Sequence, residues 1–411
     1  MSLDVVQVLS DLVRIPSVNP MGRAVSGDIY FEHRVTAHLE ALFRGLGLPV
    51  ERHTVAPKRD NIITRIEGDV PPERGGKILM LEAHQDTVPV DGMTIEPFAA
   101  KIDGGRLYGR GSCDIKGGMA AMIVALARLA REKPAGRPTV VMACTINEEH
   151  GFTGATHWAA TYSGKIPASG RGPELPPPAG RSQLLPRVPD AAIVAEPTRL
   201  NVVVAHKGAA RWRLVTQGVA THSSQPQLGE NAIYTMARVV VELEKYAKEV
   251  VPKLGQHPLC GHPTLSVGIV SGGISVNTVP DRCTIEIDRR VLPVEDPQAA
   301  FDHCVQHLAR HVQPPVKLVH ETPFMLTRGL ADGANDQHAA RLCEAIRARG
   351  GPGERIGVPF GTDAPHFAAT GCPTVVFGPG SIDQAHTADE WIDLDQLRAA
   401  AEILFDFAAH S

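Results

Sequence analysis

The sequence predicts an α/β fold with a mixed, mostly parallel β-sheet flanked by helices, and with a small α+β unit inserted into it. In the first half of the chain, short continuous apolar runs alternate with helical segments, which is typical of a sheet covered on both faces. After Asn201 the pattern changes to strands with some alternation and two long amphipathic helices, and the first pattern resumes after about Thr322. We therefore expect a discontinuous first domain interrupted by a second one.

The length of the chain agrees with two domains. A chain of 411 residues is too long for one compact core. Its hydrophobic content of 43% and charged content of 21% fit a globular protein. We expect residues 1–203 and 322–411 to form the first domain and residues 204–321 to form the inserted one.

In the first segment, apolar residues at helical spacing predict a helix over 28–45, and an Ala-, Met- and Leu-rich run predicts another over 117–131. Three apolar runs predict buried strands over 77–83, 139–146 and 191–195. The remaining predicted elements are strands over 202–205, 210–216, 264–270, 282–290 and 374–377, and helices over 230–251, 297–310, 336–349 and 393–409. Residues 163–189 are rich in Pro, Gly, Ser and Arg, and we expect a surface excursion without an assigned function there.

Charge and composition exclude several classes of protein. The net charge of −4 leaves no strong basic field, so we expect no nucleic-acid partner. The N-terminus lacks the features of a signal peptide, and no segment reaches the roughly 18 apolar residues of a membrane span. Seven scattered cysteines without a CxxC pair indicate free thiols and a cytoplasmic protein.

Polar residues follow each of the three buried strands. His84 and Asp86 follow the first, and side chains two apart on a strand point to the same side. A carboxylate beside a ligating imidazole can fix its tautomer. The alternative is an ordinary polar turn at the end of a strand.

Glu148 and Glu149 follow the second buried strand, and Glu196 follows the third. Adjacent carboxylates at the end of a buried strand repel one another unless a cation or a proton lies between them. One can bind a metal while the other takes a proton from water. The alternative for the pair is a solvated acidic loop.

Asp114 lies in a Gly-rich turn before a helix, and His386 lies in a loop near the C-terminus. Asp114 could equally cap the helix, and His386 could be an ordinary loop residue. The glycines after Asp114 do not form a phosphate-binding loop, because both GxxxxGK[ST] and GxGxxG are absent. Since sites gather at the carboxyl ends of strands, these residues together favour a site for two divalent metals in a metallohydrolase.

The joint pattern resembles the zinc exopeptidase and deacylase family that includes acetylornithine deacetylase, succinyl-diaminopimelate desuccinylase, carboxypeptidase G and aminoacylase. The resemblance covers nearly the whole chain and keeps the order of the family's motifs. These are AHQDTVP at 83–89, YGRGSCDIKGG at 108–118, TINEE at 145–149, EPT at 196–198 and QAHTADE at 384–390.

The resemblance implies a role for each residue of the expected centre. Asp114 would bridge two metals, His84 and Glu196 would complete one metal site, and Glu149 and His386 the other. Asp86 would orient His84, and Glu148 would be the general base. A cis peptide bond would follow Asp114. The metals would be zinc, with cobalt or manganese as alternatives.

The inserted unit is similar to the family's lid and dimerisation domain, which implies a homodimer through residues 204–321. His222 would reach the substrate carbonyl of the partner subunit. Arg290 would clamp a substrate carboxylate and Asn277 would also bind substrate, although both could simply brace the lid.

These implications predict hydrolysis of the amide bond in a small N-acylated amino acid. A dipeptidase or carboxypeptidase with the same metals is the near alternative. A catalytically inactive binding protein on the same scaffold is the alternative from another class.

Overall fold

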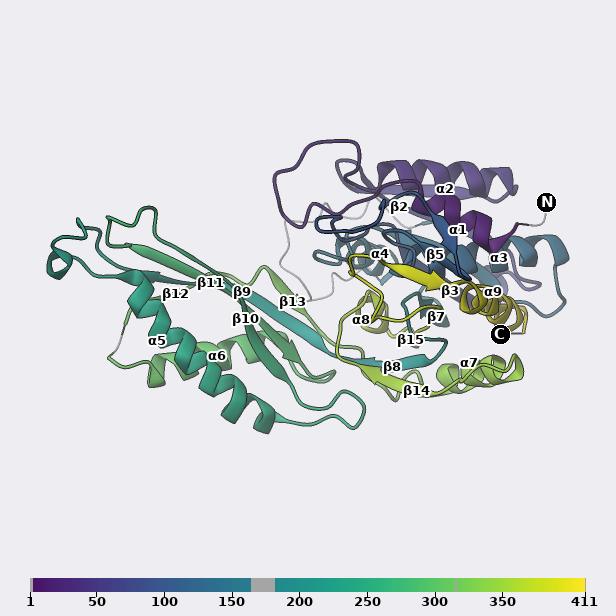
Figure 1. Cartoon of the computed structure of the whole chain (residues 1–411). Helices are drawn as coiled ribbons and strands as arrows, with labels where there is room; N and C mark the ends of the chain where they lie inside the picture. The colour runs from purple at the N-terminus through teal and green to yellow at the C-terminus, as the bar shows by residue number, and fades with distance from the viewer. Residues whose placement is uncertain (1–2, 164–181, 315, 411) are drawn as a thin grey trace.

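The computed structural model describes residues 3–163, 182–314 and 316–410. Most of the predicted excursion, residues 164–181, lies outside this range. Figure 1 shows a large sheet wrapped by helices and a smaller sheet that projects from it with helices α5 and α6 on one side. Within the described ranges, no helix is long and apolar enough to cross a membrane.

The large sheet has the strand order β1-β2-β6-β3-β7-β15-β8-β14. Four of its neighbouring pairs are parallel and three are antiparallel, which confirms the mixed, mostly parallel sheet. Its strands are Val50–Ala56 (β1), Arg59–Ile66 (β2), Ile78–His84 (β3), Thr139–Thr145 (β6), Ala191–Val194 (β7), Val202–His206 (β8), Arg355–Val358 (β14) and Thr374–Val376 (β15).

Helices cover both faces of this sheet, as the continuous apolar runs predict. Along β3, Leu79 and Leu81 belong to one apolar core, whereas Ile78 and Met80 belong to the other. Helices α1, α2, α3, α7 and α9 contribute to the first core, and α4 and α8 to the second. They span Val5–Val13 (α1), His33–Gly45 (α2), Lys116–Glu132 (α3), Thr153–Ser163 (α4), Asp336–Ala348 (α7), Ala364–Ala368 (α8) and Leu394–Ala409 (α9).

The smaller sheet, which we call the lid with its two helices (residues 208–327), has the order β10-β11-β9-β12, and β13 pairs with β9 as well. On β11 every second residue is buried beneath α5 and α6, so the opposite face of the sheet is polar. The elements are Gly208–Gln217 (β9), Ala232–Lys245 (α5), Thr264–Gly272 (β10), Arg282–Val291 (β11), Pro297–His311 (α6), Leu318–His320 (β12) and Met325–Thr327 (β13).

The two sheets meet at Lys207, because β8 ends at His206 and β9 begins at Gly208. Glycine is required at 208, since a Cβ there would lie 2.2 Å from the carbonyl oxygen of Thr327. Strand β8 spans the predicted boundary at 203/204 and pairs with the large sheet. The change of sheet therefore falls a few residues after that boundary.

Short elements complete the fold. A three-stranded sheet joins the segment before Asp114 to the C-terminal segment; it comprises Lys101–Asp103 (β4), Arg106–Tyr108 (β5) and Trp391–Asp393 (β16). The predicted helix over 230–251 ends as a regular α-helix at Lys245 and continues as a π-helical turn. The short helical turns are Pro72–Arg74 (η1), Pro226–Leu228 (η2), the π-helical Tyr246–Val250 (η3) and Val251–Leu254 (η4).

Candidate metal centre

Three neighbouring parallel strands bring the predicted polar residues together. Strands β6, β3 and β7 lie side by side and end at the same edge of the large sheet. His84 is the last residue of β3, Glu148 and Glu149 follow β6, and Glu196 follows β7. All four are buried or nearly so. Because the carboxyl ends of parallel strands meet at one edge, residues more than a hundred positions apart share one site.

Asp114 lies between the two predicted histidine ligands. Its Oδ1 is 3.2 Å from Nε2 of His84, and its Oδ2 is 3.2 Å from Nε2 of His386. Each carboxylate oxygen thus faces a different imidazole. The peptide bond between Asp114 and Ile115 is cis. The two contacts of the Asp114 carboxylate with different imidazoles are the geometry expected of a carboxylate that bridges two cation positions.

Glu149 stands beside the second imidazole, with Oε2 3.3 Å from Nε2 of His386. Its other oxygen, Oε1, is buried and has no hydrogen-bond partner among the described residues. Ligand atoms of His84, Asp114 and Glu149 all lie within 4.8 Å of one another. These side chains are close enough to share cations.

Asp86 contacts the centre in a different way from the one expected. Nδ1 of His84 lies 2.9 Å from the backbone carbonyl oxygen of Asp86, whereas the nearer carboxylate oxygen is 3.7 Å away. The carboxylate instead accepts hydrogen bonds from the backbone N–H groups of Glu148 and Glu149, at 3.1 and 3.2 Å, and from the Asn19 amide at 2.7 Å. Asp86 therefore holds the turn that carries the two glutamates.

The charges of the centre perturb one another strongly. Burial and neighbouring carboxylates raise the pKa of the Glu148 and Glu196 carboxyls well above their ordinary value. Burial would raise the pKa of Asp114 too, but hydrogen bonds from both imidazoles lower it. Burial lowers the pKa of an imidazole, yet Asp114 and Glu149 more than offset this and raise the pKa of His386 to about 11. The centre contains more carboxyl groups than imidazoles.

This donor set fits divalent cations. Imidazole nitrogens and carboxylate oxygens are ligands that zinc takes in proteins. The unpartnered Oε1 of Glu149 offers a free acceptor, and buried carboxylates in contact require a positive charge between them. The residues that could hold such cations are His84, Asp114, Glu149, Glu196 and His386.

Glu390 is a structural residue of the centre that the sequence motifs contain but to which we assigned no role. Its carboxylate is fully buried and pairs with the Arg110 guanidinium at 2.7 Å. It also accepts hydrogen bonds from the backbone N–H groups of Gly111, Cys113 and Asp114 at 2.9–3.0 Å. One carboxylate thereby fixes the whole turn that presents Asp114.

A second pair of buried carboxyls lies behind the centre. The Thr145 hydroxyl is 2.6 Å from a Glu82 oxygen and 2.9 Å from an Asp363 oxygen. The hydroxyl can donate only one proton, so one of the two carboxyls must donate to it. Burial raises the pKa of Asp363 to about 7 and that of Glu82 well above its ordinary value, which fits one shared proton.

A cleft of about 300 Å³ opens onto the centre and is closed on one side by the lid. Asp114, Glu148, Glu149, Glu196 and His386 line it from turns and loops of the domain that contains the large sheet. The lid contributes Arg290, as expected, and also Arg211, which we did not single out in the sequence. No single segment of the sequence reveals Arg211, because it is the pairing of two strands that places it directly opposite Asp288.

Two predicted substrate residues lie elsewhere. His222 and Asn277 do not line this cleft. They come after β9 and β10, at the end of the lid away from the large sheet, where the His222 imidazole bonds the Ser224 hydroxyl at 2.7 Å. A ten-residue strand such as β9 spans roughly 30 Å. One chain therefore does not bring these two side chains to its own centre.

The chain matches a known protein family over most of its length. Residues 80–410 match the pattern described as peptidase family M20/M25/M40. The chain belongs to this peptidase family. This M20-family chain is accordingly a metal-dependent amide hydrolase, as the motifs predicted.

The M20-family chain has similar relatives in both sequence and structure. It is 29% identical to an acetylornithine deacetylase of Vibrio campbellii, over 90% of this chain and 89% of the relative. It is also 29% identical to the acetylornithine deacetylase of Edwardsiella ictaluri, over 97% of this chain and 95% of that relative. The fold is shared by a metallo-carboxypeptidase of Sulfolobus solfataricus. That structure has a TM-score of 0.74 at 18% identity, over 99% of each chain.

Two further solved structures share the fold of this peptidase. Human carnosine dipeptidase 1 has a TM-score of 0.71 at 16% identity, over 99% of this chain and 95% of that one. A dinuclear metal binding peptidase of Bacillus subtilis has a TM-score of 0.63 at 17% identity, over 98% and 96%.

Substitution Glu390→Gln in this M20 peptidase is expected to destabilise the chain and to loosen the Asp114 turn. It leaves the buried Arg110 guanidinium without a counter-charge, which costs about 3–5 kcal/mol when one partner of a buried pair is removed. Denaturant unfolding measures the loss, and elemental analysis measures the accompanying loss of bound metal. The exposed acid Asp395, which pairs with Arg398, provides the matched control as Asp395→Asn. Unchanged stability in Glu390→Gln would show that the turn does not depend on this carboxylate.

Proposed function

We propose that the protein removes the acyl group from small N-acylated amino acids, as an acetylornithine deacetylase or succinyl-diaminopimelate desuccinylase would. The observation that carries the proposal is the Asp114 carboxylate, whose two oxygens face two different histidines at the floor of a cleft walled by arginines. The curated relatives named acetylornithine deacetylase span nearly the whole chain and support this substrate class.

Five side chains would hold two divalent ions, with zinc as the proposed metal and cobalt or manganese as alternatives. Asp114 would bridge the ions, with His84 and Glu196 on one and Glu149 and His386 on the other. Bound there, the metals would supply polarisation of the substrate carbonyl and a more acidic water.

Glu148 is the proposed general base. It lies beside Glu149 and Glu196 in the cleft, and none of the described residues donates a hydrogen bond to its carboxylate. It would take a proton from the water that adds to the carbonyl carbon. The same proton would pass to the nitrogen as the carbon–nitrogen bond breaks, leaving a free amine and a carboxylic acid.

Arg290 and Arg211 are proposed to bind the carboxylate of the substrate. Both guanidinium groups contact the same Asp288 oxygen, at 3.0 and 3.1 Å. Two positive charges thus share one negative charge at the wall of the cleft. The surplus favours an anionic group on the substrate, and a guanidinium suits bidentate binding of a carboxylate.

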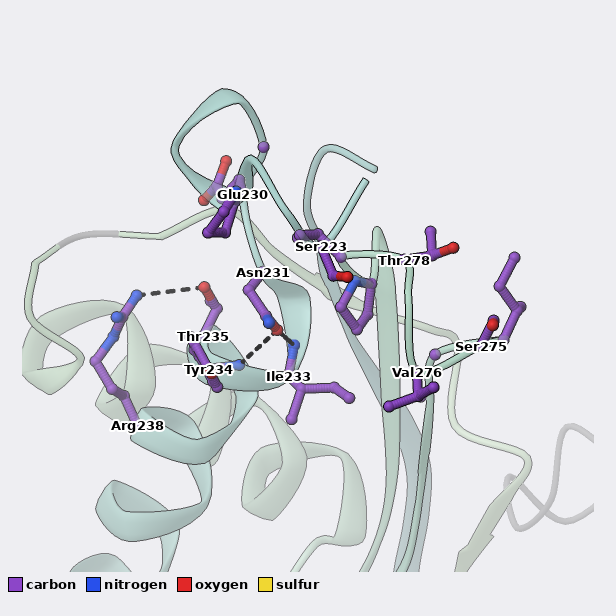
Figure 2. Close-up of a pocket in the computed structure, with 17 residues that line it drawn as sticks. Ser223, Glu230, Asn231, Ile233, Tyr234, Thr235, Arg238, Ser275, Val276 and Thr278 are labelled. Atoms are coloured by element: carbon purple, nitrogen blue, oxygen red, sulfur yellow. Dashed lines mark hydrogen bonds between the residues drawn. The ribbon is translucent and has the colours of Figure 1, made fainter. Parts of the chain in front are cut away.

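A second copy of this chain is the proposed partner, bound through the far end of the lid. A hollow of about 910 Å³ lies there, and Figure 2 shows Ile233, Tyr234 and Val276 beside it. Ile274 is 91% exposed and Tyr234 is 70% exposed. Strand β10 forms an open edge of the sheet next to this surface. An open strand edge beside exposed apolar side chains is suited to pairing with an identical edge.

Dimerisation would give His222 and Asn277 a place in catalysis. Both lie beside this surface, so a partner could present them to the centre of the other chain. His222 would stabilise the developing oxyanion of the carbonyl. The seven cysteines, all buried and free, support the proposed cytoplasmic location.

Wild-type enzyme loaded with zinc is expected to release amine from N-acetyl- and N-succinyl-amino acids faster than from dipeptides. In Glu148→Gln, turnover should fall roughly 10²- to 10⁴-fold, because the proton acceptor is gone. Elemental analysis should still find as many metals per chain as in wild type. Full activity with the metals retained would rule out this role. A dipeptide preference would favour the peptidase alternative, and metal binding without any turnover would favour the inactive binding protein.

Substitution Arg290→Ala or Arg211→Ala is expected to raise KM roughly 10- to 150-fold, the range for losing a hydrogen bond to a charged group. The effect should vanish with a substrate whose carboxylate is replaced by a carboxamide. Arg213→Ala is the control, because Arg213 lies on the same polar face but pairs with Glu286 outside the cleft. Equal losses on both substrates would mean that the arginines only brace the lid.

Mixing two inactive variants tests the shared site. His222→Ala and Glu148→Gln should each be inactive alone, but a mixed dimer pairs one intact centre with the intact His222 of its partner. After subunit exchange, random pairing predicts about one quarter of wild-type activity. Size-exclusion chromatography with light scattering confirms the dimer. A mixture with no recovered activity, in chains shown to exchange, would contradict transfer of His222 between subunits.

A further inference from the structure

A second group of metal-ligand side chains lies on the helices of the lid, far from the candidate metal centre. Helix α6 carries His303, His307 and His311 at intervals of four residues, which places them in one column on the helix. Helix α5 faces this column with Glu242, and the following turn faces it with Tyr246. The two helices are packed together through an apolar core that includes Leu243 and Leu308.

Three members of this group converge on one point. Ligand atoms of Glu242, His307 and His311 all lie within 4.8 Å of one another. Nε2 of His307 is 2.9 Å from Oε1 of Glu242. The rings of His307 and His311 are stacked with their centroids 4.1 Å apart. Glu242 and His307 are largely buried, whereas His311 is exposed, so the group is open to solvent on one side.

The hydrogen bonds around the group leave Nε2 of His311 free and pair Nε2 of His307 with Oε1 of Glu242. Nδ1 of His311 lies 2.8 Å from the carbonyl oxygen of His307 and donates to it, which puts the lone pair of His311 on Nε2. No described residue hydrogen bonds to that Nε2. A ligating histidine typically donates its other N–H to a backbone carbonyl in this way. Lys245 contacts the Oε2 atom of Glu242, at 3.8 Å, and leaves Oε1 to the histidine.

We infer that Glu242, His307 and His311 form a third metal site, which binds one zinc-class divalent cation. Two imidazoles at i and i+4 on a helix with one carboxylate are a known zinc donor set, and three protein ligands leave a position for water. Nickel and copper ions would also suit imidazole ligands. The site lies between the two helices of the lid and shares no residue with the candidate metal centre. It does not depend on the proposed function.

The bound ion would join two helices that are distant in sequence. Glu242 and His307 are 65 residues apart, and without the ion one hydrogen bond between them links these parts of α5 and α6. A ligand that binds only the folded form raises its stability by mass action. The site would therefore tie the stability of the lid to the concentration of free zinc.

Zinc titration of metal-free protein against a chromophoric chelator tests this inference. Wild-type protein is expected to bind one equivalent more than His311→Ala, which removes an exposed ligand and should fold normally. Losing an outer partner of a ligand weakens metal affinity roughly 10- to 100-fold, so losing a ligand should weaken it at least as much. Glu242→Gln should lose the same equivalent. The thermal midpoint of wild type should rise with added zinc by more than that of His311→Ala.

His410→Ala is the matched control. His410 is also exposed at the end of a helix, and its Nδ1 also bonds the carbonyl four residues earlier, at 2.9 Å. It belongs to neither metal-ligand group found among the described residues. The His410→Ala variant should bind as much zinc as wild type. Equal zinc stoichiometry and affinity in wild type and His311→Ala would overturn the inference and leave an ordinary hydrogen bond between His307 and Glu242.

Discussion

Burial of several carboxylates around Asp114 is the constraint on which the rest of this structure depends. Like charges taken out of water repel one another, so such a group persists only where the backbone is held rigidly and positive charge lies nearby. The parallel strands β3, β6 and β7 supply the rigidity, because each is buried on both faces. His84 and His386 lie against the Asp114 carboxylate, and the divalent cations that we propose for the site would supply the positive charge.

The acidic residues of the centre divide into two groups by what their oxygens accept. Asp86 and Glu390 accept hydrogen bonds from backbone N–H groups, and so they shape the turns on which other ligands sit. Among the described residues, Glu149 and Glu148 accept no such backbone hydrogen bonds, and one buried oxygen of Glu149 has no partner. A carboxylate already committed to the backbone is a poor ligand, whereas an uncommitted one is available to a cation or a proton. The hydrogen bonds therefore distinguish the acidic residues that hold the backbone in place from those that are available to bind a cation or a proton.

Much of this arrangement could be predicted from the sequence. The strands that end at His84, Glu148 and Glu196 are continuous apolar runs, which predict buried strands without further information. The hairpin of β1 and β2 was not predicted, because charged residues interrupt its apolar pattern and one side of β1 is exposed. The contacts of Glu390 with Arg110 and with the turn that carries Asp114 were not predicted either. Its partners lie some 280 positions earlier in the chain, and no local pattern indicates a contact at that distance.

The arginines of the cleft are a second case in which a contact between distant segments could not be predicted from the sequence. Arg290 was expected from a family motif, but Arg211 becomes visible only when strands β9 and β11 are paired and Asp288 comes to lie between the two guanidiniums. Register is a property of two strands, so a single segment cannot reveal it.

Strand length explains why His222 lies far from the metal centre of its own chain. The lid begins at Gly208 against the cleft and runs outward along β9, so the residues after Gln217 start roughly 30 Å away. Bringing His222 back to its own centre would require β9 to leave β11, with which it pairs along its whole length. That ladder, buried on one face against α5 and α6, holds the strand straight. The same stiffness that keeps His222 from its own Asp114 also fixes it at a defined position on an exposed surface, which is what a partner chain would need in order to use it.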